Sequence, residues 1–248
     1  SNPQRRLLLR GRACADTVAR MRLILLGVLL AVLACPGPVA RAAPAAAERS
    51  ALEGWIAAQR DTQRIVVELR QERWLKGLRK PLTNPGRLWL DRRGRMRWQI
   101  GEPPKTIAVY RDREVVVMRT DRKTVEKRTL AATGDQQGEL ERVFLFSGLP
   151  DSVARIEESF KIGETTRRDG IATVRLTPRS ARTATVLVAV DLLIDEAKHQ
   201  LTGYDVSCRD GSSIRTRFLS VVVNPPADDS VYSPDLAGYK VQESPPSR

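Results

Sequence analysis

Hydrophobic and polar residues alternate with a period of two along most of the chain from residue 65 onward. The clearest case runs from Arg95 to Ile100, where Met96, Trp98 and Ile100 share one face and the arginines point away. This alternation is typical of a β-strand that is buried on one side and solvated on the other. The same pattern predicts strands beginning at residue 65 and at 87–90, 95–100, 105–111, 114–119, 123–130, 160–164, 171–177, 185–194, 200–208 and 213–223, with a weaker candidate at 239–241.

Short polar or glycine-containing segments separate these strands. Asn84-Pro85-Gly86, Arg92-Arg93-Gly94, Asp112-Arg113 and Asp210-Gly211 are examples. Residues of these types are favoured in turns, and their close spacing indicates hairpins. The strands are therefore predicted to be antiparallel.

Two segments show a helical period instead. Ser50 is a candidate N-cap with Glu53 as its capping-box partner, and this helix is expected to reach about Arg60 after a short linker at 43–49. The second helical segment covers residues 139–146, and Gly148 and Pro150 end it.

Together these elements predict an α+β fold dominated by one antiparallel sheet of about ten to eleven strands. A sheet of this size tends to curl, and its apolar face is then covered by helices or encloses a cavity. The composition does not change abruptly after residue 42, so residues 43–248 are predicted to form a single domain.

The N-terminal residues 1–42 have the features of a secretory signal rather than of a folded domain. An apolar run spans residues 23–35, Arg20 and Arg22 precede it, and Ala40-Arg41-Ala42 forms an A-x-A cleavage site. The natural start is then Met21. The run is short for a membrane span, which needs about 20 residues.

Two other interpretations of the N-terminal run remain open. It could be an uncleaved anchor or a core helix, or Val32-Leu33-Ala34-Cys35 could be a lipobox whose Cys35 is lipidated. Removing residues 1–42 takes away seven arginines and one aspartate, so the net charge falls from +13 to +7. Much of the basic character thus belongs to the proposed targeting segment.

Candidate catalytic groups are scarce. The single histidine, His199, lies in a charged turn, and Cys208 is the only cysteine beyond residue 42, so neither a zinc site nor an internal disulfide is predicted. Phosphate-binding, dinucleotide-binding and nucleophile-elbow motifs are absent from the sequence. We therefore expect no catalytic residue, no metal and no cofactor. Acidic residues interspersed among the basic ones, together with export, argue against a nucleic-acid partner.

Several short motifs resemble the LolA family of periplasmic outer-membrane lipoprotein carriers. Leu69-Arg70-Gln71 corresponds to the family's aromatic-x-Gln element, Gly86 to Arg92 to its glycine-led strand, and Met96-Arg97-Trp98 to the apolar-x-Trp pair that follows. The segment 101–110 matches a turn-proline-strand pattern, and residues 139–149 match the position of a lid helix.

This resemblance implies an unclosed β-barrel with a helical lid over an apolar cavity that takes up acyl chains. The residues expected to line the cavity are Trp55, Leu69, Leu88, Leu90, Met96, Trp98, Ile107, Val109, Val143, Phe144 and Phe146, and Arg92 is expected to contact the lid and tune its opening.

The family further implies a monomeric carrier in the periplasm of a Gram-negative bacterium. Its cargo is an acylated lipoprotein, its donor an inner-membrane ABC transporter and its acceptor an outer-membrane receptor. Three alternatives stay open: a carrier of another lipid, a membrane-anchored receptor or sensor of the same fold lipidated at Cys35, and a lipid-processing enzyme. The lone His199 argues against the enzyme.

Overall fold

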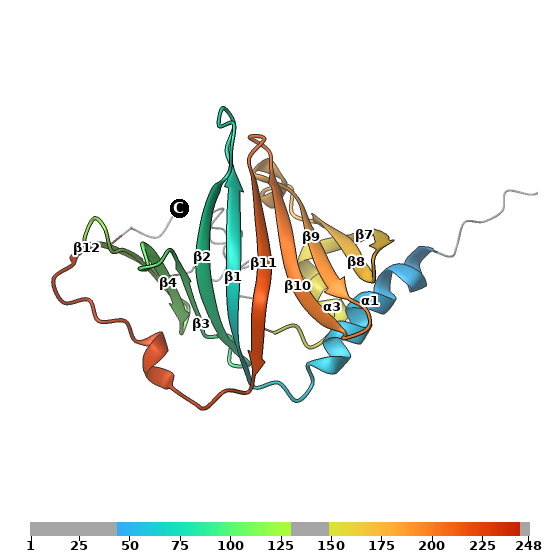
Figure 1. The fold of residues 1–248 in the computed structure, drawn as a ribbon, viewed down its shortest axis with the longest axis horizontal. Coiled ribbons are helices and arrows are strands. Elements are labelled where there is room, and N and C mark those ends of the chain that lie inside the picture. Colours follow the sequence, from blue (N-terminus) through green and yellow to red (C-terminus); the bar gives the residue numbers. More distant parts are fainter. Residues whose placement is uncertain (1–43, 130–148, 244–248) are drawn as a thin grey trace, which may run out of the picture. The chain divides into compact units, whose positions relative to one another are not determined.

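The predicted strands combine into one continuous sheet. The computed structural model describes residues 44–129 and 149–243, and within these ranges 12 strands pair in the order β12-β6-β5-β4-β3-β2-β1-β11-β10-β9-β8-β7 (Figure 1). The edge strands β7 and β12 do not pair with each other, so the sheet is not closed into a barrel. The expected unclosed, mostly antiparallel architecture is therefore confirmed, with 12 strands described rather than ten or eleven.

The strands and helices have the following bounds: α1 Pro44–Ala58, β1 Arg64–Trp74, β2 Leu82–Asp91, β3 Met96–Ile100, β4 Thr106–Arg111, β5 Glu114–Arg119, β6 Thr124–Thr129, α3 Val153–Ser159, β7 Phe160–Arg168, β8 Ile171–Pro178, β9 Leu187–Asp195, β10 Gln200–Cys208, β11 Ser213–Val223 and β12 Lys240–Glu243. Two short 3-10 helices, η1 Thr183–Thr185 and η2 Asp229–Tyr232, lie in connecting segments. All neighbouring strands are antiparallel except β12, which pairs with β6 in parallel. In the described part of the chain, no helix is both long and apolar enough to span a membrane.

Tight turns set the register of several hairpins. Asp112 and Arg113 both have positive φ, as does the Asp169-Gly170 pair. Two-residue turns of this conformation match the right-handed twist of the flanking strands, which explains the short β4–β5 and β7–β8 connections. The Asp112-Arg113 and Asp210-Gly211 turns lie where the sequence predicts them.

Two local predictions are wrong, and one short helix is missed. Asn84-Pro85-Gly86 is not a turn but part of β2, where Gly86 pairs with Leu69 and with Ile100, and the β1–β2 turn lies earlier, at 75–81. A Cβ on Gly86 would approach the Leu69 and Ile100 side chains within 2.8 Å, so a glycine is needed here for close packing rather than for turning.

The first helix begins at Pro44 rather than at Ser50, because proline suits the first turn and the alanines that follow favour helix. The sequence pattern also does not indicate α3, a helix of 7 residues capped by the Ser152 side chain.

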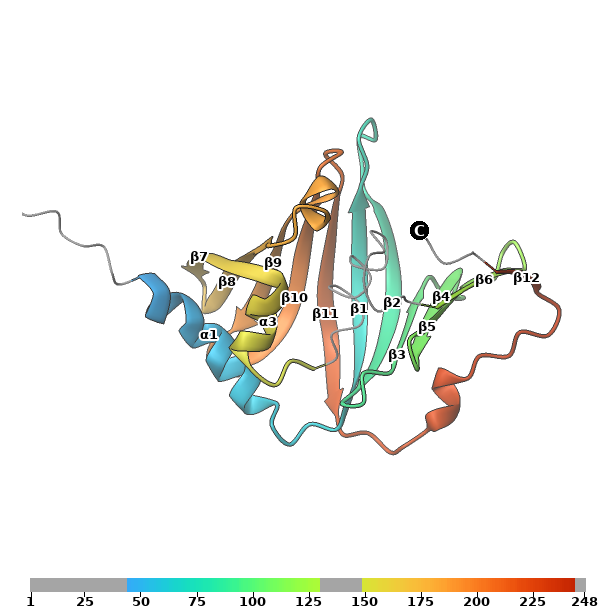
Figure 2. The ribbon, with the colours of Figure 1, turned by 180° about the vertical axis from the view of Figure 1, so that it is seen from behind.

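Both described α-helices lie on the same face of the sheet, which we call the inner face (Figure 2). Helix α1 packs on β7, β8, β9 and β10 and touches α3. Leu52, Trp55 and Ile56 from α1 join Val174, Leu187 and Ile194 from the strands in the largest buried apolar cluster. This cluster is the core of the β7–β10 half of the sheet.

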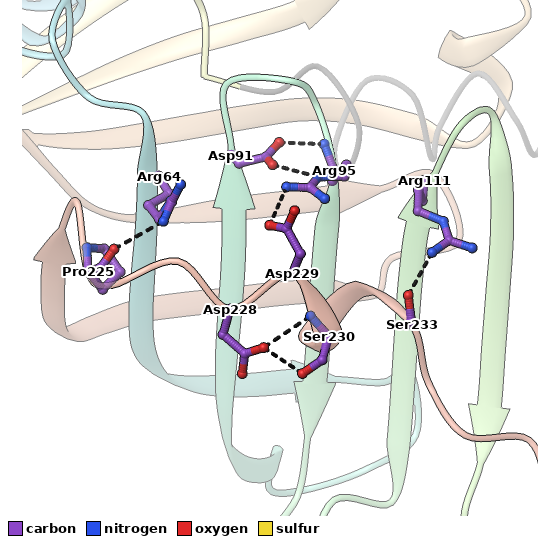
Figure 3. Close-up of polar contacts among 9 residues, drawn as sticks. All are labelled: Arg64, Asp91, Arg95, Arg111, Pro225, Asp228, Asp229, Ser230 and Ser233. Atoms are coloured by element: carbon purple, nitrogen blue, oxygen red, sulfur yellow. Dashed lines mark hydrogen bonds and ion pairs between the residues drawn. The ribbon is translucent and has the colours of Figure 1, made fainter.

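The opposite face, the outer face, is covered over β2–β6 by the C-terminal segment, residues 224–239. Tyr232 of η2 is 6% exposed and packs with Ile107, Val109, Val116 and Met118. Polar contacts hold the same segment (Figure 3): Arg95 donates to Asp229 over 2.8 Å and Arg111 donates to Ser233 over 2.7 Å. Strands β4 and β5 are consequently apolar on both faces.

Candidate ligand cavity

An apolar cavity of about 490 Å³ lies on the inner face, between the helices and the sheet. Its walls come from α1, α3, residues 149–150 and strands β1–β3 and β7–β11. This volume falls within the range of small-molecule sites, and mostly apolar walls with few polar groups are typical of them. The cavity is the strongest candidate binding site in the described part of the chain.

Strand register explains why the apolar side chains meet there. Leu88 in β2 pairs with Val67 in β1 and with Trp98 in β3, and Leu90 pairs in the same way with Ile65 and Met96. Directly paired residues point to the same face of a sheet, and so do residues two apart. One alternating pattern in three strands thus builds one continuous apolar wall.

Six of the residues predicted to line the cavity do so. They are Trp55, Leu69, Leu88, Leu90, Met96 and Trp98. Val143, Phe144 and Phe146, with the whole predicted helix at 139–146, lie outside the described residues, as do the proposed signal sequence and Cys35.

The placement of Ile107 and Val109 in the cavity is wrong. In β4 the partners of Trp98 and Met96 are Ala108 and Tyr110, so these two residues share the inner face. Ile107 and Val109 point to the outer face, where the C-terminal segment buries them to 9% and 2% exposure. The predicted alternation is one residue out of phase in this strand.

The β9–β11 wall and the helix α3 side of the cavity are not predicted from the sequence. Leu192, Tyr204, Phe218 and Val221 line the wall opposite Trp98, and Ile156 of α3 contributes on the helical side. A period-two alternation does not mark Phe218 and Val221 together, because the register of β11 shifts at Leu219 between them. The family resemblance is strongest over residues 65–130, so its motifs do not indicate lining residues in α3 or β9–β11.

A few basic side chains stand at the cavity walls. Arg155, Lys198 and His199 all contribute to its lining, and His199 is exposed, as expected for a turn residue. A Cβ on Gly54 would lie 2.7 Å from the His199 Nδ1 atom, so a glycine in α1 allows the imidazole to pack against the helix. Lys198 also pairs with Asp195 over 3.2 Å, and hydrogen bonding from Lys198 lowers the pKa of that aspartate.

Arg92 fixes the connection between α1 and β1. Its Nε donates to the Thr62 carbonyl over 2.7 Å, its Nη2 donates to the Gln59 carbonyl, and its backbone N–H donates to the Gln63 carbonyl. Gln59 and Thr62 both line the cavity. Arg92 therefore holds the end of α1 against the cavity, whereas its expected contact with the lid falls on residues outside the described ranges.

Arg92→Leu is expected to weaken this anchor without removing any apolar side chain from the core. Because two carbonyls at the end of α1 lose a charged donor, the free energy of unfolding should fall by about 2 kcal/mol. Chemical denaturation measures this directly. Arg93→Leu, at the exposed neighbouring position, is the control and should change stability by less than about 0.5 kcal/mol. Equal effects of the two substitutions would contradict the anchoring role.

The chemical character of the cavity walls indicates the kind of ligand they suit. Within residues 44–129 and 149–243, no group of three or more His, Cys, Asp or Glu side chains could hold a metal ion. The cavity brings together apolar walls, one phenol and a few basic side chains near its edge. This arrangement suits an apolar or amphiphilic ligand.

Comparisons with known proteins connect this chain to lipoprotein carriers. Residues 60–235 match the family model described as outer membrane lipoprotein carrier protein LolA. No curated protein matches the chain. Among solved structures, an uncharacterized conserved protein from Thermus thermophilus is similar over 80% of this chain and 99% of that chain, with 7% identity and a TM-score of 0.48. A putative outer membrane lipoprotein-sorting protein domain from Vibrio parahaemolyticus (73% and 94% covered, 11% identity, TM-score 0.42) and a LolA superfamily protein from Nitrosomonas europaea (74% and 96%, 8%, 0.40) are also similar.

Proposed function

Because the chain belongs to the LolA family, we propose that it is a periplasmic carrier that holds the acyl chains of a lipoprotein in its inner cavity. The observation that carries this proposal is the apolar cavity of about 490 Å³ between α1, α3 and the sheet. Exposing an acyl chain to water costs about 0.8 kcal/mol per CH₂, so a carrier must replace water with an apolar wall.

The walls suit a ligand without a fixed shape. Met96 is 2% exposed and belongs to a cluster with Leu88, Leu90 and Trp98. Methionine and leucine side chains adapt to flexible apolar ligands more readily than β-branched ones. We therefore propose binding of acyl chains rather than of a rigid planar molecule.

The route of the cargo follows from the family and from the N-terminal pattern. We propose export by the signal sequence in residues 1–42, folding of residues 43–248 as a single carrier domain, cargo delivery by an inner-membrane ABC transporter and release to an outer-membrane receptor. We propose no enzymatic step, in keeping with the carrier role of the family.

Native mass spectrometry of the full chain purified from a periplasmic extract tests the proposal. An adduct with the mass of an acylated peptide or lipoprotein is expected. A free lipid adduct would keep the carrier role and move the cargo to another lipid class. A diacyl adduct on Cys35 would instead support an anchored receptor, and a chain that neither carries an adduct nor binds N-phenyl-1-naphthylamine would contradict the carrier proposal.

A further inference from the structure

A row of polar side chains crosses the inner face beside the cavity. Strand pairing places Tyr204 of β10 next to Thr216 of β11, and Thr216 next to Gln71 of β1. Leu69 and Phe218, two residues away from Gln71 and Thr216 in the same strands, line the cavity. All three polar side chains therefore belong to the cavity face, at the end nearer the β1–β2 and β10–β11 turns (Figure 1).

Two members of this row are buried without a hydrogen-bond partner. Gln71 is 4% exposed and Thr216 is 0% exposed. In the part of the chain that the structure describes, neither the Gln71 Nε2 nor the Thr216 Oγ1 has a partner of good geometry. Buried polar atoms are nearly always paired, and leaving one unpaired is destabilising, so each exception points to a missing partner.

The third member, Tyr204, connects the row to the cavity. Its ring lines the cavity wall, and its side chain lies against Phe218, with the ring centroids 6.3 Å apart. Burial raises the pKa of Tyr204. The phenol therefore remains a hydrogen-bond donor at any physiological pH.

The chemistry of the row selects the kind of ligand atom it would bind. An amide NH₂ and two hydroxyls are neutral donors, and the next residues along the row, Leu192 and Asn84, are uncharged as well. A desolvated carboxylate or phosphate would need a cation, which the row lacks. A neutral acceptor such as a carbonyl oxygen fits without one.

We propose that Gln71, Thr216 and Tyr204 bind the carbonyl oxygen of the ester or amide that joins an acyl chain to its headgroup. This inference rests on the proposed function, since it assigns the polar end of a ligand whose acyl chain occupies the cavity. The row then sets how deep the acyl chain enters the cavity, because the ligand carries a hydrogen-bond acceptor at only one position along that acyl chain.

Two probes that differ only in the carbonyl test this inference. 1-Monopalmitoylglycerol carries an ester, and 1-O-hexadecylglycerol has the same headgroup and chain length with an ether in its place. Each is titrated against the full chain loaded with fluorescent N-phenyl-1-naphthylamine. The wild type should bind the ester about tenfold more tightly than the ether, the amount expected for a hydrogen bond to a buried donor.

The Gln71→Leu/Thr216→Val double variant should lose this preference and bind both probes equally. Its melting temperature should be unchanged or higher, because an unpaired buried polar group has been replaced by an apolar one. Gln99→Leu, a glutamine on the outer face that contacts Arg97, is the matched control and should keep the preference.

Each of the other possible outcomes of this titration would contradict a different claim. Equal binding of the two probes by the wild type, or a preference that survives in the double variant, would overturn the carbonyl site. A lower melting temperature with the preference retained would mean that the row only supports the sheet. If the wild type binds neither probe, the proposed acyl-carrier function itself fails.

Discussion

Trp98→Asp should abolish acyl-chain binding in the cavity while the chain remains folded. Trp98 lies in β3, lines the cavity and is half-buried, so we expect the core to depend less on it than on the fully buried Met96 beside it. An aspartate there would have to lose its hydration whenever an acyl chain entered, at an expected penalty of about 3 kcal/mol. The affinity for palmitic acid, measured by displacement of N-phenyl-1-naphthylamine, should therefore fall about 100-fold.

Two controls separate loss of binding from loss of folding. Trp98→Leu keeps an apolar wall and should bind palmitic acid within about threefold of the wild type. Trp89→Asp places the same charge in the neighbouring strand but on the outer face, where Trp89 packs with the residues under the C-terminal segment. That variant should lose stability and retain binding. A folded Trp98→Asp variant with wild-type affinity would show that the acyl chain does not occupy this cavity.

The sequence predicts the strands well where one face of the strand is exposed to solvent. In β3, polar and apolar residues alternate cleanly, and the observed bounds of β3 and β10 lie within one residue of those expected. Five cavity residues in strands, namely Leu69, Leu88, Leu90, Met96 and Trp98, follow from the same alternation combined with the family resemblance. Local patterning is sufficient there because each strand has only one buried face.

Where both faces of a strand are buried, the alternation of polar and apolar residues no longer shows which side chains point inward. In β4, the residues Ile107, Ala108 and Val109 are all buried. The inner face of this strand packs with apolar side chains of the neighbouring strands, and its outer face packs with Tyr232. The sequence then indicates a strand but not which residues point inward. The assignment of Ile107 and Val109 to the cavity is wrong for this reason.

Contacts between distant segments account for the other differences. Residues 224–239 are rich in Asp, Pro and Ser and have the composition of a tail, yet they cover β2–β6 because Arg64, Arg95, Arg97 and Arg111 donate to them. Those partners lie more than 100 residues away along the chain, and no local rule predicts such pairs. The unpaired atoms of Gln71 and Thr216 are likewise visible only once three strands are placed side by side.

Arg95 is the centre of the contacts that hold the C-terminal segment. Its Nε donates to the buried Asp91 carboxylate over 2.7 Å, and its Nη2 donates to Asp229 (Figure 3). Its guanidinium also lies 4.5 Å from the centre of the Tyr232 ring. These contacts keep the pKa of Arg95 above its ordinary value, mainly through the hydrogen bond to Asp229. Burial, followed by the Asp91 charge, raises the pKa of Tyr232 to about 12, so the ring under the guanidinium stays neutral.

Arg95→Leu should therefore lower the free energy of unfolding by about 3 kcal/mol, because it leaves the Asp91 carboxylate, 7% exposed, without its charged partner. For a chain of this size the melting temperature should drop by about 8 °C. Arg111→Leu is the control: Arg111 contacts the same segment through Ser233, but its side chain is 43% exposed, so the loss should stay below about 1 kcal/mol. Amide hydrogen exchange should show faster exchange in residues 229–239 and in β4 of the Arg95 variant, with palmitic acid binding unchanged. If binding fell together with stability, the outer segment and the inner cavity would be coupled through β3 and β4, and the two faces of the sheet could not be treated as separate.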